Sequence, residues 1–191
     1  MNNALRMTHC VCILLVLGLV AGCGDDNPSN VTPPDNTNVG GTIGVYTDMD
    51  GASAVVVDNG GTVEMYVVHK VDQGATACAF RVEAPAGWEL ISAQSEFPVS
   101  VGDIEDGISV AYGQCLTGTI RVMTLTYTAP GNSAADARFR VLPNSQWPEH
   151  VQVVDCSQNL VEDGRGVDSP VVLPQEGQNG GNQERPKSRQ D

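Results

Sequence analysis

The sequence predicts an all-β protein, a two-sheet antiparallel β-sandwich with roughly eight or nine strands in residues 41–173. Three observations lead to this fold class. Apolar and polar residues alternate with the period of a β-strand in many short segments. Glycine, proline, asparagine and aspartate separate these segments about every 8–12 residues, a spacing typical of sandwiches. No segment has the periodicity of an amphipathic helix, and valine, threonine and glycine are abundant.

In the first part of the domain, the clearest predicted strand is 62–71. It follows the turn Asp58-Asn59-Gly60-Gly61 and places its odd-numbered apolar residues on one face. His69 shares that face, where a histidine is more often a packed residue than a ligand. Trp88 is expected to fill the core. The strands predicted here are 42–47, 62–71, 76–83, 88–95 and 97–101, with a short apolar run at 54–57.

In the second part, 119–129 is the longest predicted strand, with threonines on its solvent side. Phe139 and Val141 are expected to point inward. The strands predicted here are 108–112, 119–129, 137–142 and 151–155, and Val161 with 167–173 forms an edge piece. The order of hairpins and long crossings resembles cohesin-like and immunoglobulin-like sandwich domains of bacterial surface proteins. This resemblance concerns architecture, and it implies no particular activity.

Near the start of the chain, a short apolar segment precedes a cysteine, in the order Leu17-Gly18-Leu19-Val20-Ala21-Gly22-Cys23-Gly24. Residues 11–20 suit the apolar part of a signal peptide but are too few to cross a bilayer as a helix, and Arg6 supplies the positive charge ahead of them. The segment resembles the lipobox of bacterial lipoproteins. The resemblance implies that 1–22 is a signal peptide, that cleavage precedes Cys23 and that Cys23 carries the lipid.

Two alternatives to a lipobox are an ordinary secretory signal peptide and a transmembrane anchor, the latter disfavoured by the polar residues 22–30. Residues 23–40 are polar and broken by prolines, so they are predicted to be a flexible tether between membrane and domain. Residues 174–191 are predicted to be a disordered polar tail. In some enteric bacteria, aspartate after the lipidated cysteine retains lipoproteins in the inner membrane. By that analogy, Gly24 favours the outer membrane.

The charge of the chain excludes some classes of partner. Residues 1–22 hold one arginine and no acidic residue, which leaves nine basic against 23 acidic residues and a net charge of −14. Such an acidic protein is not expected to bind nucleic acid or to rest on an anionic membrane surface. The membrane partner is therefore expected to be reached through the lipid at Cys23.

Three cysteines remain once the signal peptide and the lipidated cysteine are set aside, which outside the cytoplasm indicates one disulfide and one free thiol. Cys115 and Cys156 each lie at a strand boundary among glycine, glutamine and serine, so we favour their pairing. Cys78 alternates with Phe80 and Val82 and is predicted to be a buried thiol. A zinc site with His69 or His150 is the alternative, although no C-x-x-C spacing is present.

Two acidic loops are weak candidates for calcium. Asp48-x-Asp50-Gly51 is similar to the middle of a calcium loop, with Asp58 nearby, but Tyr46 and Val57 stand where that loop needs ligands. A plain turn is the favoured interpretation there and in 103–107. No cofactor is therefore predicted, with calcium at Asp48, Asp50 and Asp58 left as an alternative.

The sequence predicts a non-enzymatic, lipid-anchored binding, adhesion or surface-structural module. No nucleophile elbow, phosphate-binding loop or H-E-x-x-H motif is present. Trp147, flanked by Gln146 and Pro148, is the candidate contact for a glycan or protein ligand. The alternative is a lipid-anchored hydrolase acting on a glycan or another small substrate, with paired carboxylates or His150 as its acid and base.

Overall fold

The computed structural model describes residues 39–174, apart from the side chain of Glu162. The predicted signal peptide, the lipidation at Cys23, most of the tether and nearly all of the polar tail lie outside the described residues. Within 39–174 the chain is all-β, as predicted, and contains no helix. In this part of the chain, no helix is therefore available to span a membrane.

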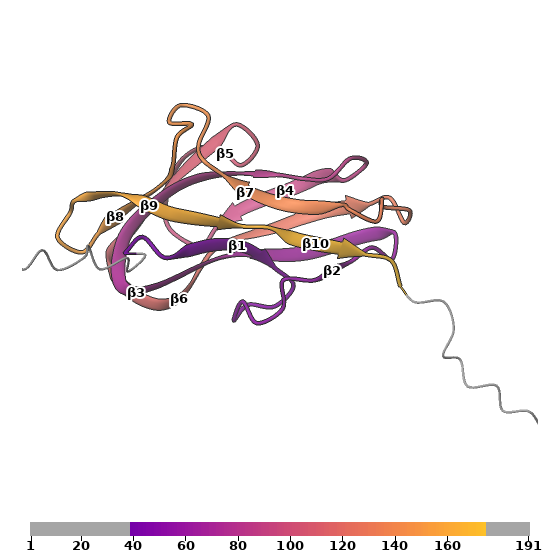
Figure 1. Cartoon of the computed structure of the whole chain (residues 1–191), viewed down its shortest axis with the longest axis horizontal. Helices are drawn as coiled ribbons and strands as arrows, with labels where there is room; N and C mark the ends of the chain where they lie inside the picture. Colours follow the sequence, from indigo (N-terminus) through magenta and orange to yellow (C-terminus); the bar gives the residue numbers. More distant parts are fainter. Residues whose placement is uncertain (1–38, 175–191) are drawn as a thin grey trace, which may run out of the picture. The chain divides into compact units, whose positions relative to one another are not determined.

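Ten strands run mainly along the long direction of the domain (Figure 1). They are β1 (Thr42–Tyr46), β2 (Val56–Val57), β3 (Gly61–Glu83), β4 (Glu89–Ser95), β5 (Val99–Asp103), β6 (Gly107–Ala129), β7 (Arg138–Leu142), β8 (Val151–Asp155), β9 (Leu160–Val167) and β10 (Ser169–Val172).

A long antiparallel ribbon of β3 and β6 organises the domain, from the pair Gly61↔Ala129 to the pair Phe80↔Ile108. The sequence predicts two strands in place of each, because polar and glycine residues interrupt the apolar alternation near 72–75 and 113–118. These interruptions bend the ribbon without ending it, and the register shifts there. Gly74 lies at the bend with a φ of 89°, which a residue with a Cβ rarely adopts.

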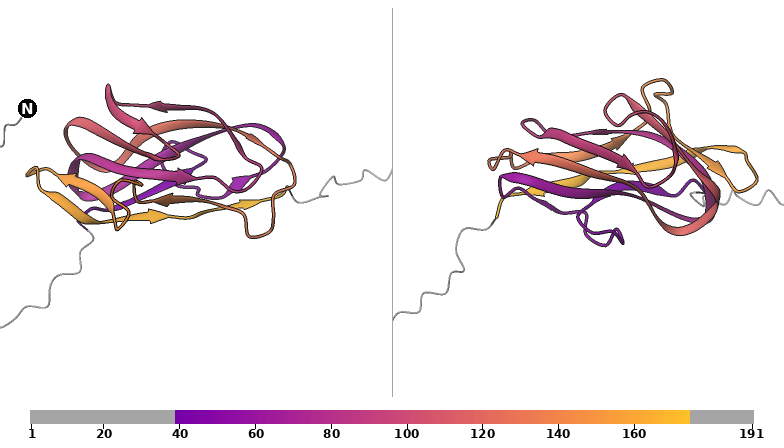
Figure 2. Two further views of the ribbon diagram at one scale, coloured as in Figure 1. Left: turned by 90° about the horizontal axis from the view of Figure 1, so that it is seen from above. Right: turned by 180° about the vertical axis from the view of Figure 1, so that it is seen from behind.

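The two halves of this ribbon belong to two sheets, and Figure 2 shows the layered arrangement from two further sides. The first half of β3 and the second half of β6 lie between β1 and β4, with β9 beside β1. The other halves lie between β8 and β5, and the last residues of β3 also pair with β7. Most pairings are antiparallel, as predicted, but β1–β9 and β2–β10 are parallel.

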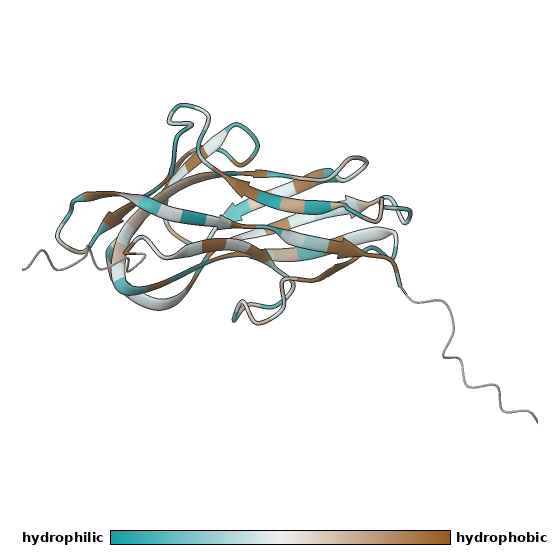
Figure 3. Cartoon of the chain, viewed as in Figure 1, coloured by the Kyte–Doolittle hydropathy of each residue, from teal (hydrophilic) through white to brown (hydrophobic). Residues whose placement is uncertain are grey.

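A single apolar core lies between the sheets. Strands such as β7 alternate between hydrophilic and hydrophobic residues (Figure 3), and their hydrophobic side chains are the buried ones. Trp88 packs edge-on against Phe139 and Tyr127, with ring centroids 5.0 and 6.4 Å apart. The predicted core positions of Trp88, Phe139 and Val141 are confirmed.

The disulfide joins Cys115 and Cys156, with Cα atoms 5.2 Å apart, and the predicted pairing is confirmed. It links the bend of β6 to the turn after β8. Gly74 packs against it, because a Cβ at that position would lie 2.6 Å from the Cys156 sulfur. The disulfide therefore fixes the bend of the ribbon to the neighbouring β8–β9 hairpin. Cys78 is the buried free thiol that the sequence predicts.

Where the chain enters the domain, the backbone is held by hydrogen bonds. The Asp163 carboxylate accepts from the amides of Val39 and Gly40, at 2.8 and 2.6 Å. His69 Nε2 lies 2.7 Å from the Gly40 carbonyl. Gly40 has no room for a side chain, since a Cβ there would lie 2.6 Å from the Gly164 nitrogen. The chain segment before β1 thus joins the domain at a fixed point.

Candidate functional site

The outer face of the β5–β6–β3–β8 sheet carries two rows of uncharged side chains. Both rows are set by the register, because residues paired across antiparallel strands point to the same side. The opposite side of these strands holds buried core residues such as Cys78 and Val110. One row is Val99, Ala111, Ala77 and Val154, continued by Leu160 of β9, and the next is Val101, Ser109, Ala79 and Gln152. We call these nine residues the apolar face.

The apolar face is shallow in its centre and exposed at its margins. Val101 is 70% exposed, Val99 56% and Leu160 54%. Alanines occupy the central strand β3, so the sheet lacks bulk there. A hollow of about 140 Å³ lies at Ala77 and Ala79, and Trp147 and Leu160 also line it. This surface can receive a convex apolar group from another molecule.

One end of the apolar face is charged. Arg81 follows Ala79 on the same side of β3, and its guanidinium is 3.7 Å from the Glu83 carboxylate. The β5–β6 turn places Glu105 and Asp106 beside Arg81, where they line a second hollow of about 450 Å³. An apolar centre beside a charged margin is the usual composition of a protein interface.

The loop 143–150 stands beside the apolar face and is fixed to the β5–β6 turn. The buried Asn144 accepts a hydrogen bond from the Gln146 amide at 2.9 Å, and Ser145 donates its amide to the Asp106 carbonyl at 3.1 Å. Gly107 is required beneath it, because a Cβ there would overlap the Asn144 side chain. The loop carries Trp147, which is 45% exposed, as expected for a ligand contact.

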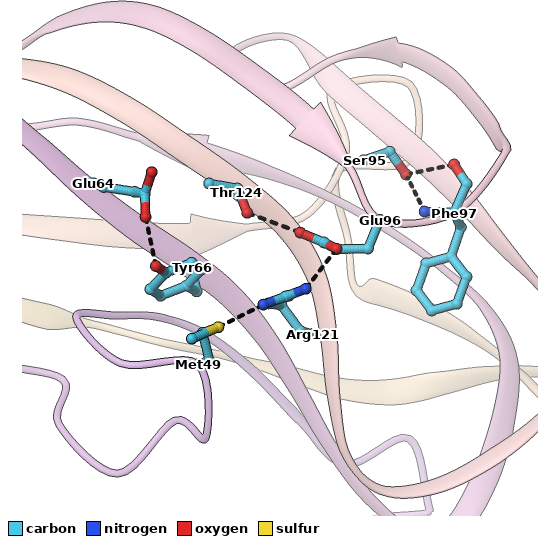
Figure 4. Close-up of polar contacts among 8 residues, drawn as sticks. All are labelled: Met49, Glu64, Tyr66, Ser95, Glu96, Phe97, Arg121 and Thr124. Carbon is cyan, nitrogen blue, oxygen red and sulfur yellow. Dashed lines mark hydrogen bonds and ion pairs between the residues drawn. The ribbon is translucent and has the colours of Figure 1, made fainter.

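The outer face of the other sheet has a different character (Figure 4). Glu96 accepts hydrogen bonds from Arg121 and Thr124, both at 2.8 Å, and Tyr66 donates to Glu64. The β1–β2 loop folds over the same side, where Met49 contacts Arg121. Lys70 donates to the Gly51 carbonyl of that loop at 2.7 Å. Polar partners thus occupy this face, while the apolar face offers uncharged side chains to solvent.

Asp48 and Asp58, considered as calcium ligands, accept hydrogen bonds from backbone amides. The carboxylate of Asp48 accepts from the amides of Asp50, Ala52 and Ser53, closing its own turn. The fully buried Asp58 accepts from the amides of Gly60, Gly131 and Ser133 and from the Ser133 hydroxyl, and so links two loops. Asp103 accepts from Glu105 and Asp106 in the same way. Across residues 39–174, no three acidic, histidine or cysteine side chains are grouped to hold a metal ion.

His69 is packed in the core, as the sequence predicts. Since the Gly40 carbonyl can only accept, Nε2 carries the proton, and Nδ1 accepts from the Tyr112 hydroxyl at 2.8 Å. Tyr112 also bonds to the Cys78 thiol, whose pKa burial raises to about 12. The imidazole and thiol are therefore neutral structural groups. His69 cannot act as a base on a substrate in solvent, and the zinc alternative loses it as a ligand.

Replacing His69 by glutamine should reduce the acid sensitivity of the fold. Burial, opposed by the Gly40 hydrogen bond, lowers the pKa of His69 below 6.5, the value of an unperturbed histidine. A depressed histidine pKa means that stability is complete above about pH 6.5 and is lost as the pH falls toward the folded value. Urea unfolding at about pH 7.5 and about pH 5 should show a smaller loss of unfolding free energy in His69→Gln than in the wild type. Equal losses would contradict this assignment.

The hydrolase alternative gains no support from His150. This residue lies on the exposed loop beside Glu149, and both line a hollow of about 230 Å³ with Trp147. No serine, threonine or cysteine lines that hollow to act as a nucleophile.

No protein-family model matches the sequence, and no curated protein matches it. Among solved structures, the sixth cohesin of scaffoldin B from Acetivibrio cellulolyticus, in complex with the Cel5 dockerin, is 15% identical with a TM-score of 0.48, covering 71% of this chain and 99% of that one. The non-cellulosomal cohesin from Archaeoglobus fulgidus is 11% identical with a TM-score of 0.45, covering 69% and 90%. CaCohA2 from Clostridium acetobutylicum is 10% identical, also with a TM-score of 0.45, covering 70% and 92%.

Proposed function

We propose that the protein is a lipid-anchored module that binds a protein partner on its apolar face. The observation that carries this proposal is the uncharged row Val99–Ala111–Ala77–Val154–Leu160, which crosses five strands on the outside of the domain. A soluble sheet with one face on the core usually presents polar side chains on its other face. In this sheet, the outer face carries alanine and valine, although the opposite face is already buried in the core.

Covering this face would be favourable. A valine or leucine side chain that moves from water into a packed interface contributes about 1.5–3 kcal/mol. Val99, Val101 and Leu160 are each more than half exposed, so a partner can still bury most of their surface. The flat row of alanines allows close approach of the partner, and the hollow at Ala79 can receive its most prominent side chain.

The charge around the face indicates the partner's chemistry. Glu105 and Asp106 lie at one end beside Arg81, whose charge is offset by Glu83, and the whole chain has a net charge of −13. A partner with an apolar patch and basic residues beside it would be attracted to this surface and oriented on it. An acidic partner would be repelled.

The anchor is the second part of the proposal. Cleavage before Cys23 and lipid attachment there would leave 23–40 as the tether, with the outer membrane as the favoured location because Gly24 follows the cysteine. The domain would then present its apolar face to partners in the cell envelope.

Val101→Asp should abolish partner binding. A carboxylate that the partner covers on this face would be desolvated without a counter-charge, which costs several kcal/mol and weakens binding on the order of 100-fold. The full chain would be purified from its native membranes, and copurifying proteins would be quantified by mass spectrometry. At least one protein should copurify with the wild type and be lost from Val101→Asp.

Ile91→Asp is the matched control for Val101→Asp. Ile91 is also an exposed aliphatic residue on an edge strand, 57% exposed, but its strand belongs to the other sheet. The same partner should therefore copurify with Ile91→Asp. If both variants retain the same proteins as the wild type, the apolar face is not the binding site.

A further inference from the structure

The loop 143–150 forms a second hollow next to the one on the apolar face. It measures about 230 Å³ and is lined by Gln146, Trp147, Pro148, Glu149, His150 and Gln152. Trp147 and Gln152 also line the smaller hollow on the apolar face, so the two hollows are neighbours. We call the larger one the tryptophan hollow.

Polar side chains around the tryptophan hollow are unpaired. In the part of the chain that the structure describes, no hydrogen bond or ion pair engages the side chains of Gln146, Glu149, His150 or Gln152. Each amide offers two donors and an acceptor, the carboxylate offers acceptors, and the imidazole offers one of each when neutral. A ligand in the hollow would therefore find several groups free to hydrogen-bond with it.

The hollow is held in place before any ligand arrives. The Trp147 amide donates to the Asn144 carbonyl at 2.9 Å, and the buried Asn144 packs against Gly107. Gln152 belongs to β8, which is paired with β3. A site on a fixed loop and a strand loses less conformational entropy on binding than one that must first become ordered.

We propose that the tryptophan hollow binds one residue of an uncharged oligosaccharide. A pyranose ring has an apolar C–H surface that can stack on an indole, and a rim of hydroxyl groups that both donate and accept hydrogen bonds. The hollow supplies one half-exposed indole and a surrounding set of amide, carboxylate and imidazole groups, which matches both properties. Its volume suits a single ring, since pockets for larger ligands start at about 300 Å³.

The acidic side chains around the tryptophan hollow disfavour the binding of anionic sugars. Glu149 lines the hollow itself, and Pro148 is shared with the neighbouring hollow that contains Glu105 and Asp106. That hollow also holds Arg81, but its guanidinium is paired with Glu83, so the surrounding charge stays negative and would repel a sulfated or carboxylated sugar. A purely cationic ligand would use Glu149 but leave the two glutamine amides unpaired, and a single aromatic ring is a poor cage for it.

The binding test uses the purified full chain and isothermal titration calorimetry with four probes: chitotetraose, cellotetraose, a chitosan tetramer and a sulfated heparin tetrasaccharide. A neutral probe should bind, and Trp147→Ala should weaken its binding at least tenfold. Comparison of the two neutral probes shows whether N-acetyl groups contribute. Val101→Asp, which is expected to lose the protein partner, should keep its sugar affinity, so this proposal and the protein-binding proposal can fail separately.

Fluorescence locates the bound sugar. The chain has two tryptophans, and Trp88 is buried in the core, so a change in emission on adding sugar reports on Trp147. Trp147→Phe should keep calorimetric binding within about tenfold and lose the emission change. The proposal is overturned if neither neutral probe binds at about 10 mM, if only a charged probe binds, or if Trp147→Ala binds as tightly as the wild type. It is also overturned if Trp147→Ala weakens only the protein partner.

Discussion

Replacing Cys23 by serine should abolish labelling of the protein with fatty acid and leave an uncleaved or misrouted precursor. Residues 17–24 resemble the lipobox of bacterial lipoproteins. In such lipoproteins, the sulfur of the lipobox cysteine forms a thioether bond to the lipid. A serine hydroxyl is a far weaker nucleophile near neutral pH than a cysteine thiol. The measurement is metabolic labelling with a fatty acid, followed by separation of membrane and soluble fractions.

Cys78→Ser is the control for this substitution, because Cys78 is buried in the domain and its thiol is unavailable to a lipid-transferring enzyme. It should be labelled and fractionate with the membrane like the wild type. Persistent labelling of Cys23→Ser would show that the lipid is attached elsewhere.

The double substitution Cys115→Ser and Cys156→Ser should lower the free energy of unfolding by about 4 kcal/mol. The disulfide closes a loop with a sequence separation of 41, and the chain-entropy relation gives about this value for such a loop. The bend of β3 should also lose packing contacts, because Gly74 packs directly against the two sulfurs. Chemical denaturation of wild type and variant under non-reducing conditions measures the difference.

Reduction provides an internal control for the disulfide. The wild type in excess reductant should approach the stability of the double variant, while the variant should be insensitive to reductant. A double variant within about 1 kcal/mol of the oxidised wild type would mean that the ribbon is held by packing alone. Because Cys23 precedes the folded domain, Cys23→Ser should leave this stability unchanged.

Strand positions could be predicted from the sequence wherever one side of a strand is buried. The 151–155 prediction matches β8, and 137–142 matches β7 within one residue, because alternation and turn residues mark these segments clearly. The lengths of β3 and β6 could not be predicted. A glycine at positive φ can either bend a strand or end it, and the surrounding sequence looks the same in both cases. Pairing with distant strands decides which of the two occurs.

The candidate site was only partly predictable. Trp147 stood out because it lies between polar and proline residues, and the disulfide followed from the setting of each cysteine. The apolar face was missed, although Ala77 and Ala79 are visible on the side of 76–83 opposite Phe80. Alanine occurs on both buried and exposed surfaces, so its presence in a strand does not predict an apolar outer face. The face is recognised only from the strand register, which places Ala77 beside Ala111 and Ala111 beside Val99. The acidic turns were considered as calcium sites, but the carboxylates of Asp48 and Asp103 accept hydrogen bonds from backbone amides of their own turns.

Site-specific photo-crosslinking in living cells tests the central claim most directly. A photoreactive amino acid would replace Val101, Leu160 or Ile91 in separate full-length variants, and crosslinked proteins would be identified by mass spectrometry. We expect Val101 and Leu160 to crosslink to the same partner and Ile91 to crosslink to none, because only the first two belong to the apolar face. A partner captured from Ile91 but not from Val101 or Leu160 would contradict the account.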